Sequence, residues 1–124
     1  MALTTGYITN TRNTGTAATN VVLNLVNENQ SNAATVLVKI FYSQSPDVKI
    51  PLYVNAFTLP VNSIRRAVFF VQGVLAYEVQ YNVSSATPND VILSSYGLDE
   101  FGNIVQEQRV LHSELNTISA LSPS

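Results

Sequence analysis

The stretch that decides the fold is AYEVQYNV, residues 76–83. Apolar and polar side chains alternate along its whole length, and successive side chains of a β-strand point to opposite faces of a sheet. The pattern therefore predicts a strand with one face in the core and the other turned outward. The apolar face would carry Tyr77, Val79, Tyr81 and Val83, and the polar face Glu78, Gln80 and Asn82.

The same period of two recurs on both sides of this stretch, in short runs separated by turn residues. Seven runs of this kind predict an all-β domain, an antiparallel two-sheet sandwich of jelly-roll type, which an eighth strand would complete. Ser43–Lys49 and Gly97–Asn103 are the predicted turn and hairpin connection. The other six runs are Val21–Val26, Thr35–Tyr42, Leu52–Leu59, Ile64–Val71, Val91–Tyr96 and Ile104–Leu115.

The first twenty residues, MALTTGYITNTRNTGTAATN, form a second informative segment. Half of them are Thr or Asn, so the segment favours extended structure but offers few side chains for a core of its own. We interpret residues 1–20 as an extended N-terminal connector arm that pairs with another molecule, ahead of a sandwich over residues 21–118 and a short polar tail over 119–124. The apolar anchors of the arm would be Leu3, Tyr7 and Ile8. The arm is also the candidate for the eighth strand.

The composition favours self-association. Only 11% of the 124 residues are charged and the formal net charge is −2, against about 25% charged residues in an ordinary soluble domain. A surface built from Asn, Thr, Ser and Gln presents little electrostatic repulsion to copies of itself. Six scattered basic residues give no nucleic-acid footprint, and no apolar run is long enough to span a bilayer. The chain has no cysteine, which excludes disulfides and thiolate metal sites.

A secretory signal peptide is not recognisable at the N-terminus, because no basic segment is followed by an apolar one. If the protein reaches the outside of a cell, we expect another route, such as lysis of the cell that made it.

Residues suited to catalysis are present but not in catalytic patterns. His112 is the single histidine, and Ser113 beside it would point to the opposite face of a strand. The hydrolase elbow G-x-S-x-G and the phosphate-binding glycine motifs are absent. Asp99 and Glu100 fall in a turn, and Glu107 and Glu114 are an odd number of residues apart, so they would face opposite ways. We therefore expect no enzyme activity, and no catalytic, cofactor-binding or metal-binding residues.

Two arginines follow one another at Arg65 and Arg66. Neighbouring strand residues point in opposite directions, so we expect one of them in solvent and the other along a sheet edge or a contact between subunits.

Three segments together carry a family resemblance: TGYITNTRNTG in the arm, AYEVQYNV, and VILSSYGLDEFGNIVQEQRVLHSEL. The chain resembles the subunits of endospore appendages, the pilus-like fibres on spores of Bacillus and related Bacillota, and especially their cysteine-free class, called F-type. The resemblance implies a jelly-roll subunit of an extracellular fibre on the spore surface. Its connector, Met1 to about Arg12, would insert into a neighbouring copy, Asn13–Asn20 would be the flexible join, and the sheets of adjacent subunits would pair laterally.

The resemblance also implies partners. These are other copies of the chain in a helical homopolymer, with a spore-surface anchor and a tip protein, and neither nucleic acid nor a membrane. Without cysteines, the fibre would be held by strand addition and side-chain packing alone.

Three other functions stay open at this point. One is a jelly-roll binding module on a spore or virion surface that binds a carbohydrate or protein ligand, with Tyr53, Tyr77 or Tyr96 stacking on a sugar. The second is a small enzyme on a β-sandwich. The third is a virion or tail decoration protein, which would also assemble with itself.

Overall fold

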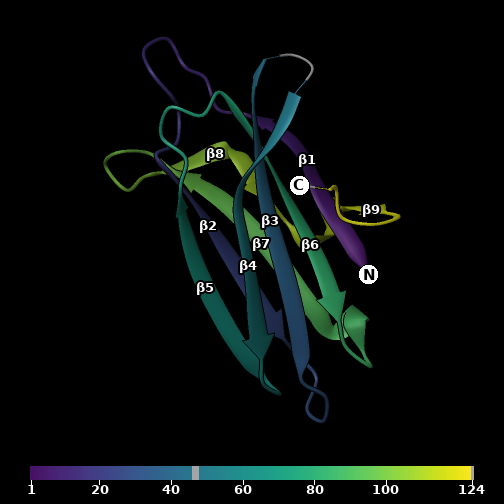
Figure 1. The fold of residues 1–124 in the computed structure, drawn as a ribbon. Helices are drawn as coiled ribbons and strands as arrows, with labels where there is room; N and C mark the ends of the chain where they lie inside the picture. The colour runs from purple at the N-terminus through teal and green to yellow at the C-terminus, as the bar shows by residue number, and fades with distance from the viewer. Residues whose placement is uncertain (46–47, 124) are drawn as a thin grey trace.

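Two antiparallel β-sheets make up the structure, a computed structural model that describes residues 1–45 and 48–123 (Figure 1). The described residues include no α-helix; two short 3₁₀ turns lie at Pro88–Asp90 and His112–Glu114. The predicted all-β, two-sheet class is therefore confirmed. The strands are β1 (Ala2–Thr9), β2 (Asn20–Asn27), β3 (Ala34–Ser45), β4 (Val48–Leu59), β5 (Ser63–Phe70), β6 (Ala76–Ser84), β7 (Val91–Leu98), β8 (Ile104–Val110) and β9 (Asn116–Ile118).

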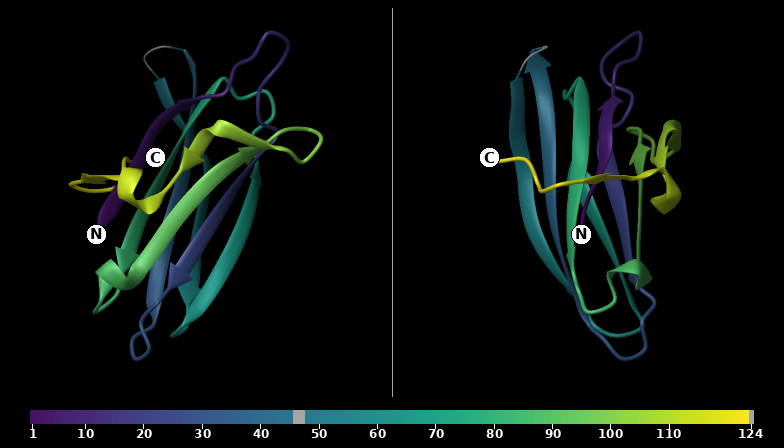
Figure 2. Two further views of the ribbon diagram at one scale, coloured as in Figure 1. Left: turned by 180° about the vertical axis from the view of Figure 1, so that it is seen from behind. Right: turned by 90° about the vertical axis from the view of Figure 1, so that its right-hand side faces the viewer.

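The two sheets are built mostly from strands that are distant in the sequence. One sheet has five strands in the order β4-β3-β6-β1-β9, and the other has four in the order β5-β2-β7-β8. Seen along its edge, the molecule is two layers, and the C-terminal segment passes from the β8 side across that edge to the five-stranded sheet (Figure 2). The C-terminal segment thus connects the two sheets along this edge.

Every strand that the alternation predicts is present, with small differences at the ends. The turn predicted over Ser43–Lys49 is shorter, because β3 continues to Ser45 and β4 begins at Val48; Pro46 and Asp47 lie outside the described residues. The long run predicted from Ile104 to Leu115 breaks after Val110 into a 3₁₀ turn. Residues 116–124, which we expected to be mostly loop, begin with the three-residue strand β9.

The core lies where the stretch 76–83 places it. Tyr77, Val79, Tyr81 and Val83 are buried between the sheets. The Tyr77 hydroxyl donates a hydrogen bond of 2.8 Å to Gln108 Oε1, so a polar atom that is taken from water keeps a partner. Burial raises the pKa of Tyr77 far above its ordinary value.

The N-terminal segment is the main difference from the sequence prediction. Ala2–Thr9 is strand β1 of the chain's own five-stranded sheet, antiparallel to β6 on one side and to β9 on the other. Leu3 lies opposite Tyr81 and is buried, so the expectation that this segment contributes little to its own core is wrong. The segment does fill the place of an additional strand of the sandwich.

A bulge inside β1 explains how its few apolar side chains reach the core. The pairing with β6 shifts between Thr4 and Tyr7, where Gly6 has a φ of 70°, a conformation that glycine adopts without strain. The Val79 N–H donates a hydrogen bond of 3.0 Å to Thr5 Oγ1. The threonine hydroxyl therefore takes the place of a backbone acceptor where the ladder between β1 and β6 is interrupted. Because of the bulge, Leu3 and Ile8 both contact the core although they are an odd number of residues apart.

Candidate functional site: two sheet faces and a pocket

The three predicted anchors of the arm are divided between two faces of β1. Leu3 and Ile8 face the chain's own core, opposite Tyr81 and Tyr77. Tyr7 lies on the outer side opposite Glu78, and 45% of its surface is exposed. Nothing in these positions sets the three residues apart as one contact surface. Instead, Leu3, Tyr7 and Ile8 each lie opposite a residue of the neighbouring strand β6.

One buried side chain fixes the segment that joins β1 to β2. Asn10 is fully buried, and its amide Nδ2 donates to the carbonyl oxygens of Ala18, Val71 and Val74 at 3.2, 3.4 and 2.9 Å. Its Oδ1 accepts from Ala18 N–H at 2.8 Å and from Gln108 Nε2 at 2.7 Å. Between Asn10 and Ala18, residues 11–15 are exposed. In the joining segment, the hydrogen bonds of Asn10 therefore hold the end of β1, and an exposed loop follows it.

The outer face of the four-stranded sheet is unusual because it is largely apolar. Residues directly opposite one another in antiparallel strands share a face of the sheet, so the register of β5, β2, β7 and β8 fixes its members. We call this surface the apolar face. Its apolar members are Val22, which is fully buried, and Val26, Ile64, Val68, Phe70, Ile92, Tyr96, Leu98 and Ile104, and its polar members are Asn20, Asn24, Arg66 and Ser94. The edge strand β8, which borders this face, also exposes Gln106, Glu107 and Arg109.

Many of these side chains are open to solvent: Ile64 is 71% exposed, Phe70 56% and Val68 51%. The whole outer face of four strands of about eight residues measures about 19 Å by about 26 Å, on the order of 500 Å², and its apolar members make up part of that area. Apolar patches of a few hundred Å² are often functional surfaces for interaction with another molecule. The sequence did not predict this face because β5 has apolar side chains on both of its sides. Its pattern therefore does not show which side is buried.

The outer face of the five-stranded sheet carries a cluster of polar side chains beside apolar residues such as Leu37, Phe41 and Val54. We call it the polar face. Glu78 lies at its centre, accepting hydrogen bonds from Thr4 and Gln80, with Lys49 Nζ 3.0 Å from its Oε1. Burial alone would raise the pKa of Glu78, but the hydrogen bonds and the charge of Lys49 outweigh it and hold the pKa below its ordinary value. Burial and the Glu78 charge together raise the pKa of Tyr7.

The C-terminal segment lies on this polar face. Ser122 accepts hydrogen bonds at its hydroxyl and its carbonyl oxygen from two lysines, Lys49 and Lys39, at 3.0 and 3.1 Å. Its N–H and its hydroxyl also bond the amide of Gln80, each at 2.8 Å. The chain's own tail therefore covers the part of this face around Gln80.

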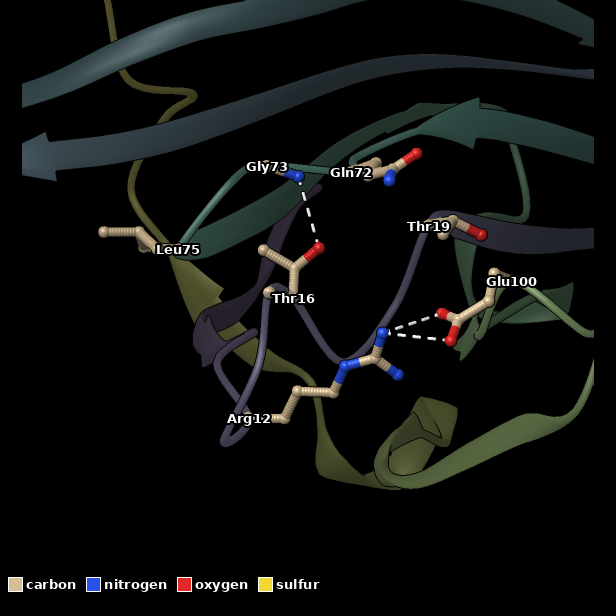
Figure 3. A pocket seen from close by; sticks show the side chains of 8 residues that line it. Arg12, Thr16, Thr19, Gln72, Gly73, Leu75 and Glu100 are labelled. Atoms are coloured by element: carbon tan, nitrogen blue, oxygen red, sulfur yellow. Dashed lines mark hydrogen bonds and ion pairs between the residues drawn. The ribbon is translucent and has the colours of Figure 1, made fainter.

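A pocket of about 420 Å³ lies between the β1–β2 loop, the β5–β6 connection and the β7–β8 hairpin (Figure 3). The Arg12 guanidinium points across its mouth to Glu100, with both carboxylate oxygens 3.0 Å from Nη2. Thr16 Oγ1 accepts from Gly73 N–H at 3.2 Å on the opposite wall. The remaining lining residues are Gly15, Thr19, Gln72 and Leu75.

The residues considered for catalysis have other roles. His112 Nδ1 accepts a hydrogen bond of 3.1 Å from the Leu93 N–H and so fixes the turn after β8. Asp99 Oδ1 accepts from the N–H groups of Phe101 and Asn103, which builds the β7–β8 turn. Within residues 1–45 and 48–123, no three His, Asp or Glu side chains are grouped as they would be to hold a metal ion.

The arginine pair and the candidate stacking tyrosines are also placed by the sheets. Arg65 lies 5.2 Å from the ring centre of Phe57, whereas Arg66 belongs to the apolar face. Of the three tyrosines, Tyr96 is the one on the outer face of the four-stranded sheet. Tyr77 is in the core, and the Tyr53 hydroxyl donates a hydrogen bond of 2.8 Å to the Phe70 carbonyl oxygen.

No family model, curated protein or solved structure matches this chain. Among the described residues, no helix has the length and apolar character needed to cross a membrane.

Proposed function

We propose that this chain is a structural subunit that assembles with copies of itself into an extracellular fibre on the endospore surface. The observation that carries the proposal is the apolar face, which a solitary protein in water would be expected to cover with polar side chains. The paired positions of β5, β2 and β7 on this face include one charged side chain, Arg66, and the edge strand β8 exposes Glu107 and Arg109, which carry opposite charges, so copies would stack without strong repulsion. Lateral contact through this sheet is the first element of the assembly.

Exchange of strand β1 is the second element. β1 has β6 on one side, but on the other only the three-residue strand β9. Exposed residues 11–15 would serve as a hinge through which β1 and Asn10 move together into the same place on a neighbour, where they would remake the contacts described above. The predicted connector, Met1 to about Arg12, ends at this hinge. Exchange that does not close on itself gives an open fibre.

The jelly-roll type belongs to this proposal as well. In a jelly roll the strands pair in a nested order, and β2 with β7 and β3 with β6 are two such pairs. The location on the spore surface, and the anchor and tip proteins as partners, rest on the resemblance of the three quoted segments. Immunogold labelling of intact spores with an antibody to the recombinant chain tests that location, and absence of label from the spore surface and its fibres contradicts it.

Two valines give a matched test of the lateral contact. Val68 on the apolar face and Val54 on edge strand β4 are 51% and 50% exposed, so each would place an aspartate in a similar degree of solvent. Val68→Asp should abolish assembly, because a charge would be buried between sheets, and Val54→Asp should not. Light scattering and negative-stain microscopy at tens of micromolar measure this. A wild-type chain that stays monomeric at all concentrations contradicts the proposal.

A disulfide tests strand exchange directly, since the chain has no cysteine of its own. Ala2 and Asn82 lie opposite each other in β1 and β6, a spacing that a disulfide can bridge. Oxidising Ala2→Cys/Asn82→Cys as a monomer should lock β1 in its own chain and block fibre growth until reductant is added. Oxidising after assembly should give a covalent ladder on non-reducing gels. Fibres from the locked monomer would exclude strand exchange and leave lateral contact standing.

Ligand binding is a second candidate function, and the pocket between Arg12 and Glu100 favours it. A paired guanidinium and carboxylate beside threonine hydroxyls offers hydrogen-bond donors and acceptors to the hydroxyl groups of a carbohydrate. Isothermal titration with mono- and disaccharides, with Glu100→Gln as the control variant, tests this function. Binding that is lost in Glu100→Gln would support it, and no heat with any sugar would exclude it.

A further inference from the structure

Four hydrogen bonds hold Ser122 of the C-terminal tail on the sheet. Gln80 bonds it twice: Oε1 accepts from the Ser122 N–H, and Nε2 donates to the Ser122 hydroxyl, both at 2.8 Å. Lys39 Nζ donates 3.1 Å to the carbonyl oxygen, and Lys49 Nζ donates 3.0 Å to the hydroxyl. The backbone N–H, the backbone oxygen and the side chain of one serine are therefore all bonded.

The part of this site that contacts the tail is buried beneath it and oriented by a hydrogen bond within the sheet. With the tail in place, Gln80 is 1% exposed and Glu78 5%. Gln80 Nε2 donates a second hydrogen bond, 2.9 Å long, to Glu78 Oε2. An ionised carboxylate only accepts hydrogen bonds, so it fixes which end of the Gln80 amide carries the nitrogen. Oε1 is thereby turned to a backbone N–H and Nε2 to a hydroxyl. We call Lys39, Lys49, Glu78 and Gln80 the serine clamp.

These contacts define the chemistry of the ligand. The N–H and carbonyl contacts require a peptide backbone at this position, and the two donors on Oγ require a small side chain with a hydroxyl oxygen. Alanine at that position would lose two hydrogen bonds, from Gln80 and Lys49. The clamp is therefore a binding site for a serine-bearing peptide segment and not only a patch on which the tail rests.

We propose that, in the assembly, the serine clamp of one copy binds the C-terminal segment of a second copy. This inference rests on the proposed self-assembly. The tail of another copy has the same sequence and can make the same hydrogen bonds, so its own tail and a neighbour's compete only through their effective concentrations. In a fibre, where neighbours lie side by side, that concentration is high. The tail then links subunits in addition to the apolar face and β1.

Two full-length variants separate the two partners of this contact. Gln80→Leu keeps the tail but loses the clamp, and Ser122→Pro keeps the clamp but removes the N–H and hydroxyl of its own tail. A fluorescent peptide of residues 116–124 is the probe. It should bind Ser122→Pro about tenfold more tightly than wild type, because the wild-type tail competes for the site. It should not bind Ser122→Pro/Gln80→Leu, and the same peptide with alanine at 122 should bind about tenfold more weakly.

Gln106→Leu is the matched control, since Gln106 is an exposed glutamine on the other sheet; in the Ser122→Pro background it should leave peptide binding unchanged. Mixing Gln80→Leu with Ser122→Pro should then give a hetero-complex in light scattering that neither chain gives alone. Three outcomes would each overturn the inference. The first is no saturable peptide binding to a Ser122→Pro chain that circular dichroism shows to be folded. The others are equal peptide binding after Gln80→Leu and the absence of the hetero-complex.

All chains in these titrations carry Val68→Asp, so assembly through the apolar face does not enter the measurement. Fibres of the wild-type chain, together with no peptide binding by the Ser122→Pro chain that carries Val68→Asp, would therefore overturn the serine clamp and keep the proposed function. Peptide binding by that chain, together with a wild-type chain that forms no fibres, would overturn only the proposed function.

Discussion

Leu3 and Tyr81 lie directly opposite each other on the neighbouring strands β1 and β6, and both side chains are buried in the core. This pair joins the N-terminal segment to the centre of the fold. The alternation of β6 predicted the inward position of Tyr81 correctly. The composition of residues 1–20 had suggested the opposite position for Leu3, outside its own core. The stability of the chain should therefore depend on its first strand.

Leu3→Ala should destabilise the isolated chain by about 2–4 kcal/mol, the usual effect of truncating a buried leucine. Tyr7→Ala, at an exposed position of the same strand, should change the free energy of unfolding much less. Urea unfolding followed by circular dichroism measures both. Equal stability losses for the two variants would mean that β1 does not pack as described.

Removal of Met1–Arg12 should leave a chain that is mostly unfolded, because β6 would lose its neighbour and Leu3 its place in the core. From the sequence alone the truncated chain would be expected to remain folded, so this experiment decides between the two. A synthetic peptide of the first twelve residues should restore the far-ultraviolet spectrum by binding the empty place. A truncated chain with native stability would show that β1 is dispensable.

Asn10→Ala should destabilise the chain by about 2–4 kcal/mol, because several buried backbone groups would lose their partner at once. The exposed Asn13 in the same loop is the matched control, and Asn13→Ala should have little effect. Thermal unfolding of both variants measures the difference. If Asn10→Ala unfolds at the wild-type temperature, then the loop is not held by this side chain.

Gly97→Ala should destabilise the chain by about 1–3 kcal/mol through overpacking. A Cβ at this position would overlap Gln108 Oε1 and lie 3.0 Å from Ala18 Cβ. Gln108 also accepts the Tyr77 hydroxyl, so the clash would disturb a buried hydrogen bond. The double variant Gly97→Ala/Gln108→Ala should lose less than the sum of the two single losses. Strict additivity in a double-mutant cycle would contradict the contact.

Glu78 should make stability depend on pH in the acid range. Its folded-state pKa lies below the ordinary value of 4.5, so the unfolded chain binds the proton at higher pH than the folded chain does. The carboxylate therefore contributes stability above that value and loses the contribution as pH falls through the folded-state pKa. The stability difference between wild type and Glu78→Gln should shrink from pH 7 to pH 2 in urea titrations, with exposed Glu107→Gln as the control. A difference that does not change with pH would contradict the prediction.

Local patterns were sufficient wherever one side of a strand is polar. In β6 the polar side chains of Glu78, Gln80 and Asn82 left one choice for the inward face, and the structure agrees. In β5 both sides are apolar or basic, and Ile64, Val68 and Phe70 turned out to face solvent while Phe69 is buried. Alternation gives the two faces of a strand, but only packing against the second sheet decides between them.

The sequence by itself determined that the chain is all-β, where its strands lie, and that its surface carries few charges. Only the tertiary structure decided that β1 pairs with β6 in the same chain, that one outer face is apolar, and that Ser122 is bound by Gln80. The physical reason is the range of the forces involved. The period of two is a local property of the backbone, whereas strand partners make the same backbone hydrogen bonds in any order and are selected by contacts between residues far apart in the chain.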